Sequence, residues 1–169
     1  MIQKQKQSKL GTGGLKMRDY LFRGKPKDKD QFNAFSVAWA EYCFNGFIYG
    51  SLVKCNNRCY IAVTAQCSNK SIINNGITTM IEVIPETVGP YIGLTDSNGK
   101  KIFEGDIVKS CEYDDVYFVK YFDSDNYSAF DCVPDVPLCE CNGLSYLVNE
   151  EGCKVIGNIY DDKEILDVK

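Results

Sequence analysis

The most specific pattern in the chain is GPYIGLTDSNGKKIFEGDIV, residues 89–108. Mainly apolar residues at 91–94 and 101–103 flank the segment Asp96–Gly99. Aspartate, serine, asparagine and glycine tolerate a left-handed backbone or hydrogen-bond their own main chain, so they are the usual residues of tight turns. The pattern predicts a β-hairpin with its turn at residues 96–99.

A glycine and an aspartate interrupt the apolar pattern directly after this hairpin. Gly105 can take a positive φ, and the carboxylate of Asp106 can accept nearby backbone N–H groups. We expect the chain to turn a sharp corner here and to resume as a new strand through Ile107 and Val108. A strand, a hairpin and a corner so close together are typical of small, strongly bent β-barrels.

Strand and turn signals continue on both sides of the hairpin. Asn56-Asn57 and Asp123–Asn126 separate apolar segments and predict two more hairpins, and Pro85–Thr87 ends a strand because proline cannot donate to a ladder. The expected strands are 19–23, 47–53, 59–65, 77–84, 116–122, 127–133, 144–148 and 154–160. This spacing predicts a mainly β fold of antiparallel strands, with some α+β character from a short helix or helical turn.

Other segments lie outside these strands. Proline and alternating charges at 25–30 predict an exposed loop. Residues 32–44 fit both the alternation of a strand and the 3.6-residue period of a helix, so both interpretations stay open; Asp30 as an N-cap and Asn45-Gly46 as a stop favour a short helix. Its aromatic face is expected to cover the sheet. Residues 161–166 predict a terminal helical turn capped by aspartate.

Composition and charge limit the classes of function. The 169 residues are 44% hydrophobic, which is enough for a core. Residues 1–29 carry nine Lys and Arg against two Asp, a net of +7, so the net charge of −4 leaves −11 on residues 30–169. An acidic body repels phosphate backbones, and nucleic acid is therefore not an expected partner. Neither a membrane-spanning run nor a secretory signal is present, so we expect the protein in the host cytoplasm, without a membrane partner.

Residues 85–108 resemble the core signature of the YopX family of phage and prophage proteins. Residues 18–25, 47–53 and 155–161 are similar to its opening strand, second block and closing strand, whereas 28–45 and 132–153 depart from the pattern. The resemblance implies a β-rich fold with an SH3-like barrel in its C-terminal part, a phage origin and a molecular role that is not established. It supplies no catalytic residues.

The same observations divide the chain into parts. We expect a flexible basic tail at residues 1–16, an N-terminal β-rich part at 17–84, and the part with the SH3-type barrel at 85–169. Residues 17–169 also fit a single compact domain.

The chain has few of the groups that perform catalysis. It has no histidine, which removes the commonest general base and zinc ligand. Its nine cysteines are expected to be reduced thiols; Cys55, Cys59, Cys139 and Cys141 are the one arrangement that resembles a zinc site, but their spacing is irregular. Clustered carboxylates flank turns, where aspartate is selected for backbone reasons. We therefore predict no enzyme, no catalytic residue, no metal and no cofactor.

Two hypotheses for function remain. The first is a self-associating, homo-oligomeric binding protein that acts on a host or phage protein through exposed tyrosines and sheet edges. The alternative is a small-ligand binder that sequesters a nucleotide-like host signalling molecule in an aromatic pocket with a cation. The candidate ligand-binding residues are Arg23, Tyr49, Ser51 and Asp106, which are polar groups within the family-like strands.

Overall fold

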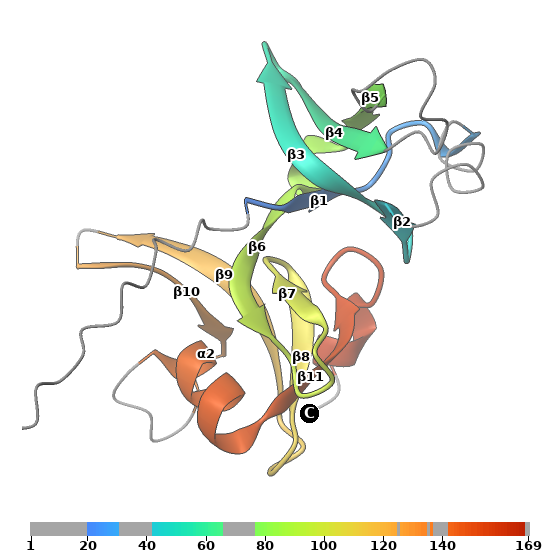
Figure 1. Cartoon of the computed structure of the whole chain (residues 1–169). Helices are drawn as coiled ribbons and strands as arrows, with labels where there is room; N and C mark the ends of the chain where they lie inside the picture. Colours follow the sequence, from blue (N-terminus) through green and yellow to red (C-terminus); the bar gives the residue numbers. More distant parts are fainter. Residues whose placement is uncertain are drawn as a thin grey trace, which may run out of the picture.

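The computed structural model describes residues 20–30, 42–65, 77–124, 126–134, 136 and 142–167. Within these residues the fold is mainly β, with two antiparallel sheets and one short α-helix (Figure 1). The prediction of a mainly β, antiparallel fold is confirmed. No helix of the described residues is long and apolar enough to cross a membrane.

The first sheet contains seven of the described strands. Its order is β5-β4-β3-β1-β6-β7, and β2 pairs with β3 beside this path. The strands are β1 (Phe22–Gly24), β2 (Cys43–Phe44), β3 (Phe47–Cys55), β4 (Arg58–Ala65), β5 (Ile77–Val83), β6 (Gly89–Thr95) and β7 (Lys101–Phe103). A 3₁₀ turn, η2 (Pro85–Thr87), connects β5 to β6 and ends the strand where the sequence predicts.

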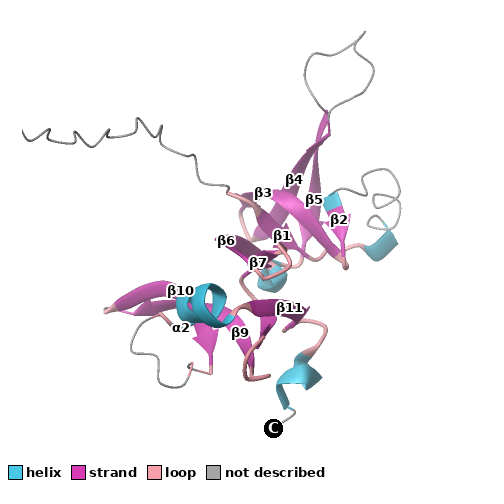
Figure 2. Cartoon of the chain, turned by 60° about the horizontal axis from the view of Figure 1, so that its bottom comes forward, coloured by secondary structure: helices cyan, strands magenta, loops and turns pink. Residues whose placement is uncertain are grey.

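The second sheet contains the four remaining described strands, in the order β10-β9-β8-β11. They are β8 (Asp106–Ser110), β9 (Val116–Ser124), β10 (Tyr127–Val133) and β11 (Cys153–Asn158). The helix α2 (Gly143–Tyr146) runs into a π-helical turn, η3 (Leu147–Glu151), and lies beside β10 (Figure 2). A 3₁₀ turn, η4 (Lys163–Asp167), follows β11 and confirms the predicted terminal helical turn.

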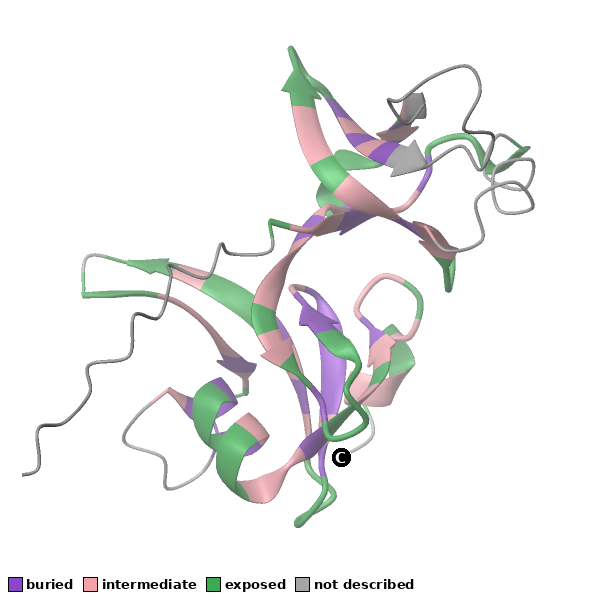
Figure 3. Cartoon of the chain, in the orientation of Figure 1, coloured by how far each residue is buried: buried purple, intermediate pink, exposed green. Residues whose placement is uncertain are grey.

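Each sheet has its own hydrophobic core (Figure 3). The alternate residues Ile61 and Val63 of β4 and Ile81 and Val83 of β5 point to one face of the first sheet, where they are buried with Ile48. The second core gathers buried residues of β8, β9 and β10, the helical segment and Ile102 of β7. Because β7 belongs to the first sheet, Ile102 joins the packing of the two sheets.

The β6–β7 turn also reaches the free edge of β11. The buried carboxylate of Asp96 accepts the backbone N–H of Val155 at 3.1 Å, and the N–H of Ser97 donates to the carbonyl of Cys153 at 2.9 Å. These bonds cover the edge without a continuous ladder, and a closed barrel is not found among the described strands. The SH3-like barrel at 85–169 stays a prediction. The predicted boundary between the two parts at residue 85 also stays a prediction. Strands from the two sides of this boundary pair with each other, because β1 pairs with β6.

The central hairpin and corner are confirmed. Antiparallel β6 and β7 enclose the turn at residues 96–99, where Asp96 accepts the N–H groups of Asn98 and Lys100. Gly105 has a φ of 82°, and a Cβ at this position would lie 3.0 Å from the ring of Tyr160. Only glycine combines this backbone with such close packing.

The strand predicted at 144–148 is wrong, because these residues belong to the helical segment. The side chain of Asn142 caps the helix by accepting the N–H of Ser145 at 2.7 Å. Leu144 and Leu147, three positions apart, are both buried against the second sheet. A helix buries residues at this spacing on one face, which a strand does not.

Two smaller predictions also need correction. The segment 25–30 is not a wholly exposed loop, because Pro26 is buried and bridges to Val83, and the N–H of Lys27 donates to the carbonyl of Glu82 at 3.0 Å. Asn45 and Gly46 do not end a helix; they have φ values of 50° and 74° and form the two-residue turn between β2 and β3. The question of helix or strand at 31–41 lies outside the described residues.

Candidate functional site

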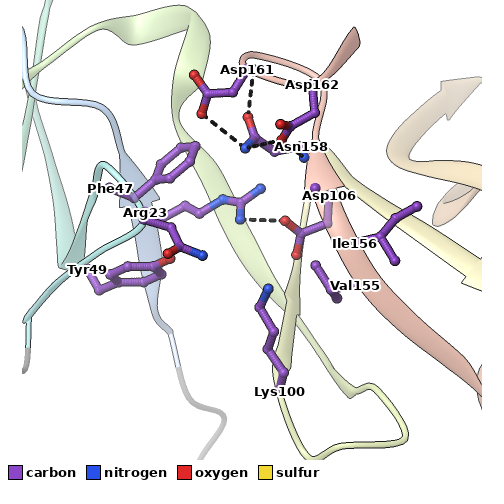
Figure 4. A pocket seen from close by; sticks show the side chains of 12 residues that line it. Arg23, Phe47, Tyr49, Lys100, Asp106, Val155, Ile156, Asn158, Asp161 and Asp162 are labelled. Carbon is purple, nitrogen blue, oxygen red and sulfur yellow. Dashed lines mark hydrogen bonds and ion pairs between the residues drawn. The ribbon is translucent and has the colours of Figure 1, made fainter. Parts of the chain in front are cut away.

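A buried ion pair joins the two sheets. Arg23 lies on β1 between Tyr49 of β3 and Gly89 of β6. Its Nη1 lies 2.5 Å from Oδ1 of Asp106, the first residue of β8, and its Nη2 donates to the carbonyl of Glu104 at 3.2 Å (Figure 4). Arg23 is 4% exposed and Asp106 1%. The first sheet thus supplies the cation and the second supplies the anion.

The local backbone explains why these two side chains meet. A Cβ on Gly89 would lie 2.5 Å from the carbonyl oxygen of Glu104, so glycine is required for β6 to run this close to the corner. After the corner at Gly105, the second oxygen of Asp106 accepts the N–H of Phe103 at 2.8 Å. The carboxylate predicted to accept backbone N–H groups therefore does so, and it also pairs with Arg23.

Aromatic rings surround the guanidinium. Its central carbon lies 4.5 Å from the ring centroid of Phe47 and 5.1 Å from that of Phe103, both within the range of cation–π attraction. The rings of Tyr49 and Phe103 meet edge to face at 5.4 Å. Arg23 Nε is buried and has no hydrogen-bond partner among the described residues. The guanidinium therefore keeps one donor unused.

Burial dominates the acid–base properties of this cluster. It raises the pKa of the Asp106 carboxyl, and the charge of Arg23 and the N–H of Phe103 oppose this rise. Burial also raises the pKa of Tyr49, against the opposing charge of Arg23. The Tyr49 hydroxyl is therefore neutral near pH 7, when it can donate or accept a hydrogen bond.

A polar cavity of about 320 Å³ lies on one side of the pair. Its wall includes Asn158, whose side-chain amide donates to Asp161 at 3.1 Å and to Asp162 at 3.2 Å (Figure 4). Burial acts to raise the pKa of Asp161, but hydrogen bonds from Lys25 and Asn158 outweigh it, and the pKa lies below its ordinary value. These carboxylates already have partners within the protein.

A second cavity, of about 380 Å³, is mostly apolar. We call it the aromatic groove; its lining residues are Leu21, Arg23, Tyr42, Phe44, Tyr49, Gly50, Lys100, Lys101 and Phe103. The side chain of Phe44 is 60% exposed at its edge. Arg23, Tyr49 and Lys100 line both cavities, so the two meet at these three residues.

Three of the four predicted ligand-binding residues lie together. Arg23, Tyr49 and Asp106 line the polar cavity, whereas Ser51 is exposed on β3 and lines neither cavity. Whether any of them binds a ligand stays a prediction. Sequence reasoning missed Phe44 and Lys100. The Asn45-Gly46 turn was a usable signal for Phe44, because it places residue 44 at the end of a hairpin strand.

The four cysteines whose irregular pattern resembles a zinc site are only partly covered by the described residues. Cys55 is exposed and Cys59 buried, on neighbouring strands β3 and β4, while Cys139 and Cys141 lie outside the described residues. Among the described residues no group of three or more potential metal ligands occurs.

Comparisons with known proteins give one family match. The model of a family described as YopX protein matches residues 25–167, which is most of the chain. A comparison with curated proteins found no match. Among solved structures, the crystal structure of protein EF1440 from Enterococcus faecalis is similar with a TM-score of 0.37 and 23% sequence identity, covering 62% of this chain and 86% of that one.

Proposed function

The chain belongs to the YopX family, and from this membership we propose that it is a phage- or prophage-encoded binding protein. It acts without catalysis in the host cytoplasm, by holding a host or phage protein. The aromatic groove supports this function most directly: an apolar cavity of about 380 Å³ with a largely exposed phenylalanine at its edge. Recognition surfaces are enriched in aromatic residues, and exposed apolar surface of this kind is typical of interaction sites.

Self-association is part of the proposal. In the described sheets β5 and β10 are end strands. Residues 25–27 pair with the end of β5, so the remainder of its edge and the edge of β10 offer unpaired backbone groups to a second copy. Cyclic assembly covers such edges and is the common form of homo-oligomers. Sedimentation of the purified protein tests this part by itself.

Site-specific cross-linking in the host cell tests the binding of a partner. A photoreactive benzoylphenylalanine replaces Phe44 in the groove or, as the control, Tyr113 between β8 and β9, which is 62% exposed and lies outside both the groove and the end strands. We expect a discrete cross-linked protein from position 44 that is absent from position 113. Equal cross-linking from both positions, or none from position 44, would contradict the proposal.

The polar cavity favours a second candidate function, a small-ligand binder that sequesters a nucleotide-like host signalling molecule. Its volume of about 320 Å³ lies within the range of ligand pockets. However, Asp106, Asp161 and Asp162 in its wall oppose a phosphate-bearing ligand. Native mass spectrometry of protein purified from infected cells separates the two functions: a bound metabolite in place of a protein partner favours the second.

A further inference from the structure

The aromatic groove has a positive end. Lys100 follows the β6–β7 turn and lines both cavities, and Figure 4 shows its side chain pointing toward the Arg23–Asp106 pair. Among the described residues its ammonium makes no ion pair, although its charge acts on the nearby Asp106 carboxyl and opposes the rise in the pKa of that group. The neighbouring Lys101 places its ammonium 4.9 Å from the ring centroid of Tyr91 at the rim of the same groove. Two lysines thus lie at one end of an apolar surface, beside the Arg23 guanidinium, whose own charge is paired with Asp106.

At the same end of the groove, Arg23 has a hydrogen-bond donor without a partner among the described residues. This donor is the buried Nε, and the residue as a whole is only 4% exposed. A buried donor without a partner is destabilising, so an acceptor that comes within reach of it is favoured. The neutral hydroxyl of Tyr49 lies in the same shared wall. A negatively charged acceptor is the group that suits Lys100, Arg23 and Tyr49 together.

We infer that the aromatic groove binds a segment of a partner protein in which a large apolar side chain lies next to acidic side chains. The apolar side chain contacts Phe44 and Phe103, and a carboxylate lies at Lys100 and Arg23. The proposed charge is carried by side chains, and not by a chain terminus, because acidic side chains on either side of the apolar residue can reach Lys100 whichever way the segment runs, whereas a terminus brings only one carboxylate. This inference rests on the proposed function and adds the chemistry of the partner.

The protein as a whole has a net charge of −4, so this attraction is local. An acidic segment gains from Lys100 and Lys101 only at short range, and salt screens the interaction within about 8 Å at physiological ionic strength. Affinity should therefore come from the apolar contact, and selectivity from the carboxylates.

Two matched peptides test the inference. The probe is acetyl-Asp-Phe-Asp-amide, and its neutral equivalent of the same shape is acetyl-Asn-Phe-Asn-amide. Titrations followed by amide chemical shifts at low salt should show the acidic peptide binding about tenfold more tightly, as expected for exposed charge pairs reinforced by a buried donor. The Lys100→Met variant should abolish this preference, and Phe44→Ser should weaken both peptides. Lys120→Met, an exposed lysine on β9, is the control and should change neither.

Several outcomes of the peptide titrations would contradict this binding mode. Equal affinity for both peptides, a preference that survives in Lys100→Met, or no binding of either peptide would overturn the inference. A third peptide, acetyl-Asn-Phe with a free C-terminal carboxylate, tests the source of the charge. If it binds as tightly as the acidic probe, the groove does not select acidic side chains over a chain terminus, and the inference is wrong on this point. Cross-linking from position 44 remains an independent readout, because it reports a partner protein whether or not that partner is acidic.

Discussion

Removing the carboxylate of Asp106 tests whether the buried ion pair is a main contact between the two sheets, beside the packing of Ile102 and the hydrogen bonds from the β6–β7 turn to β11. In Asp106→Ala the guanidinium of Arg23, 4% exposed, keeps its charge between two aromatic rings and loses its nearest anion. Removing one partner of a buried pair costs about 3–5 kcal/mol. The N–H of Phe103 loses its acceptor as well, which adds about 1 kcal/mol.

The assay is urea unfolding followed by far-ultraviolet circular dichroism. We expect Asp106→Ala to lower the free energy of unfolding by about 4–6 kcal/mol, or the melting temperature by roughly 8–24 °C at about 2–4 °C per kcal/mol for a domain of this size. If this variant does not fold, Asp106→Asn gives the milder perturbation, because its amide oxygen can still accept the N–H of Phe103. Its expected loss is about 2–4 kcal/mol.

A double-mutant cycle separates the pair from its surroundings. Arg23→Met combined with Asp106→Asn leaves no buried charge unpaired, so it should be less destabilised than the sum of the single variants by about 2 kcal/mol or more. Arg58→Met, which breaks an exposed ion pair with Glu82, is the control and should not change stability measurably. Single losses below about 1 kcal/mol, or additive effects in the cycle, would refute the argument.

Three further outcomes are expected. Gly105→Ala should cost about 1–3 kcal/mol, because φ is 82° and a tyrosine ring lies against the new Cβ, whereas Gly99→Ala, with φ 79° and open space, should cost about 1 kcal/mol in the same urea assay. Burial and nearby carboxylates raise the pKa of Tyr117 from 10.0 to about 12, so its contribution to stability is complete below pH 10 and is lost as the pH rises towards 12; Tyr117→Phe should flatten this alkaline decline. Burial raises the pKa of Cys153 to about 11, so at pH 8 a thiol reagent should label the exposed Cys55 rapidly and Cys153 only on unfolding.

The sequence predicts those structural features that depend only on residues close to one another along the chain. The hairpin of residues 89–108 and its corner need only the turn residues Asp96–Gly99 and the positive φ of Gly105, and both are local properties. The helix at 143–146 was missed because a short apolar run fits a strand or a buried helix equally well by pattern alone. Its capping residue, Asn142, was the local signal that could have decided between them.

The candidate site depends on contacts that no local pattern contains. Arg23 and Glu104, which share a hydrogen bond, are 81 positions apart, and β1 reaches β6 only after four other strands have been placed. The family-like positions drew attention to Arg23, Tyr49 and Asp106, but not to their mutual packing. Lys100 had no predicted role, because its position near Arg23 depends on the pairing of β6, the first strand of the hairpin, with β1.

Variants at Arg23 and at Lys100 report on different properties, the first on folding and the second on binding. Arg23 lines both cavities but also joins the sheets, so a variant at this position loses stability and any ligand together and cannot report on recognition alone. Lys100 is exposed and makes no ion pair within the described part of the chain; its charge acts on the Asp106 carboxyl, but the direct partner of Asp106 is Arg23, so we expect the Arg23–Asp106 pair to persist without Lys100. A binding defect in Lys100→Met at unchanged stability therefore assigns recognition to the groove, whereas a matching loss of stability would place Lys100 with the structural pair.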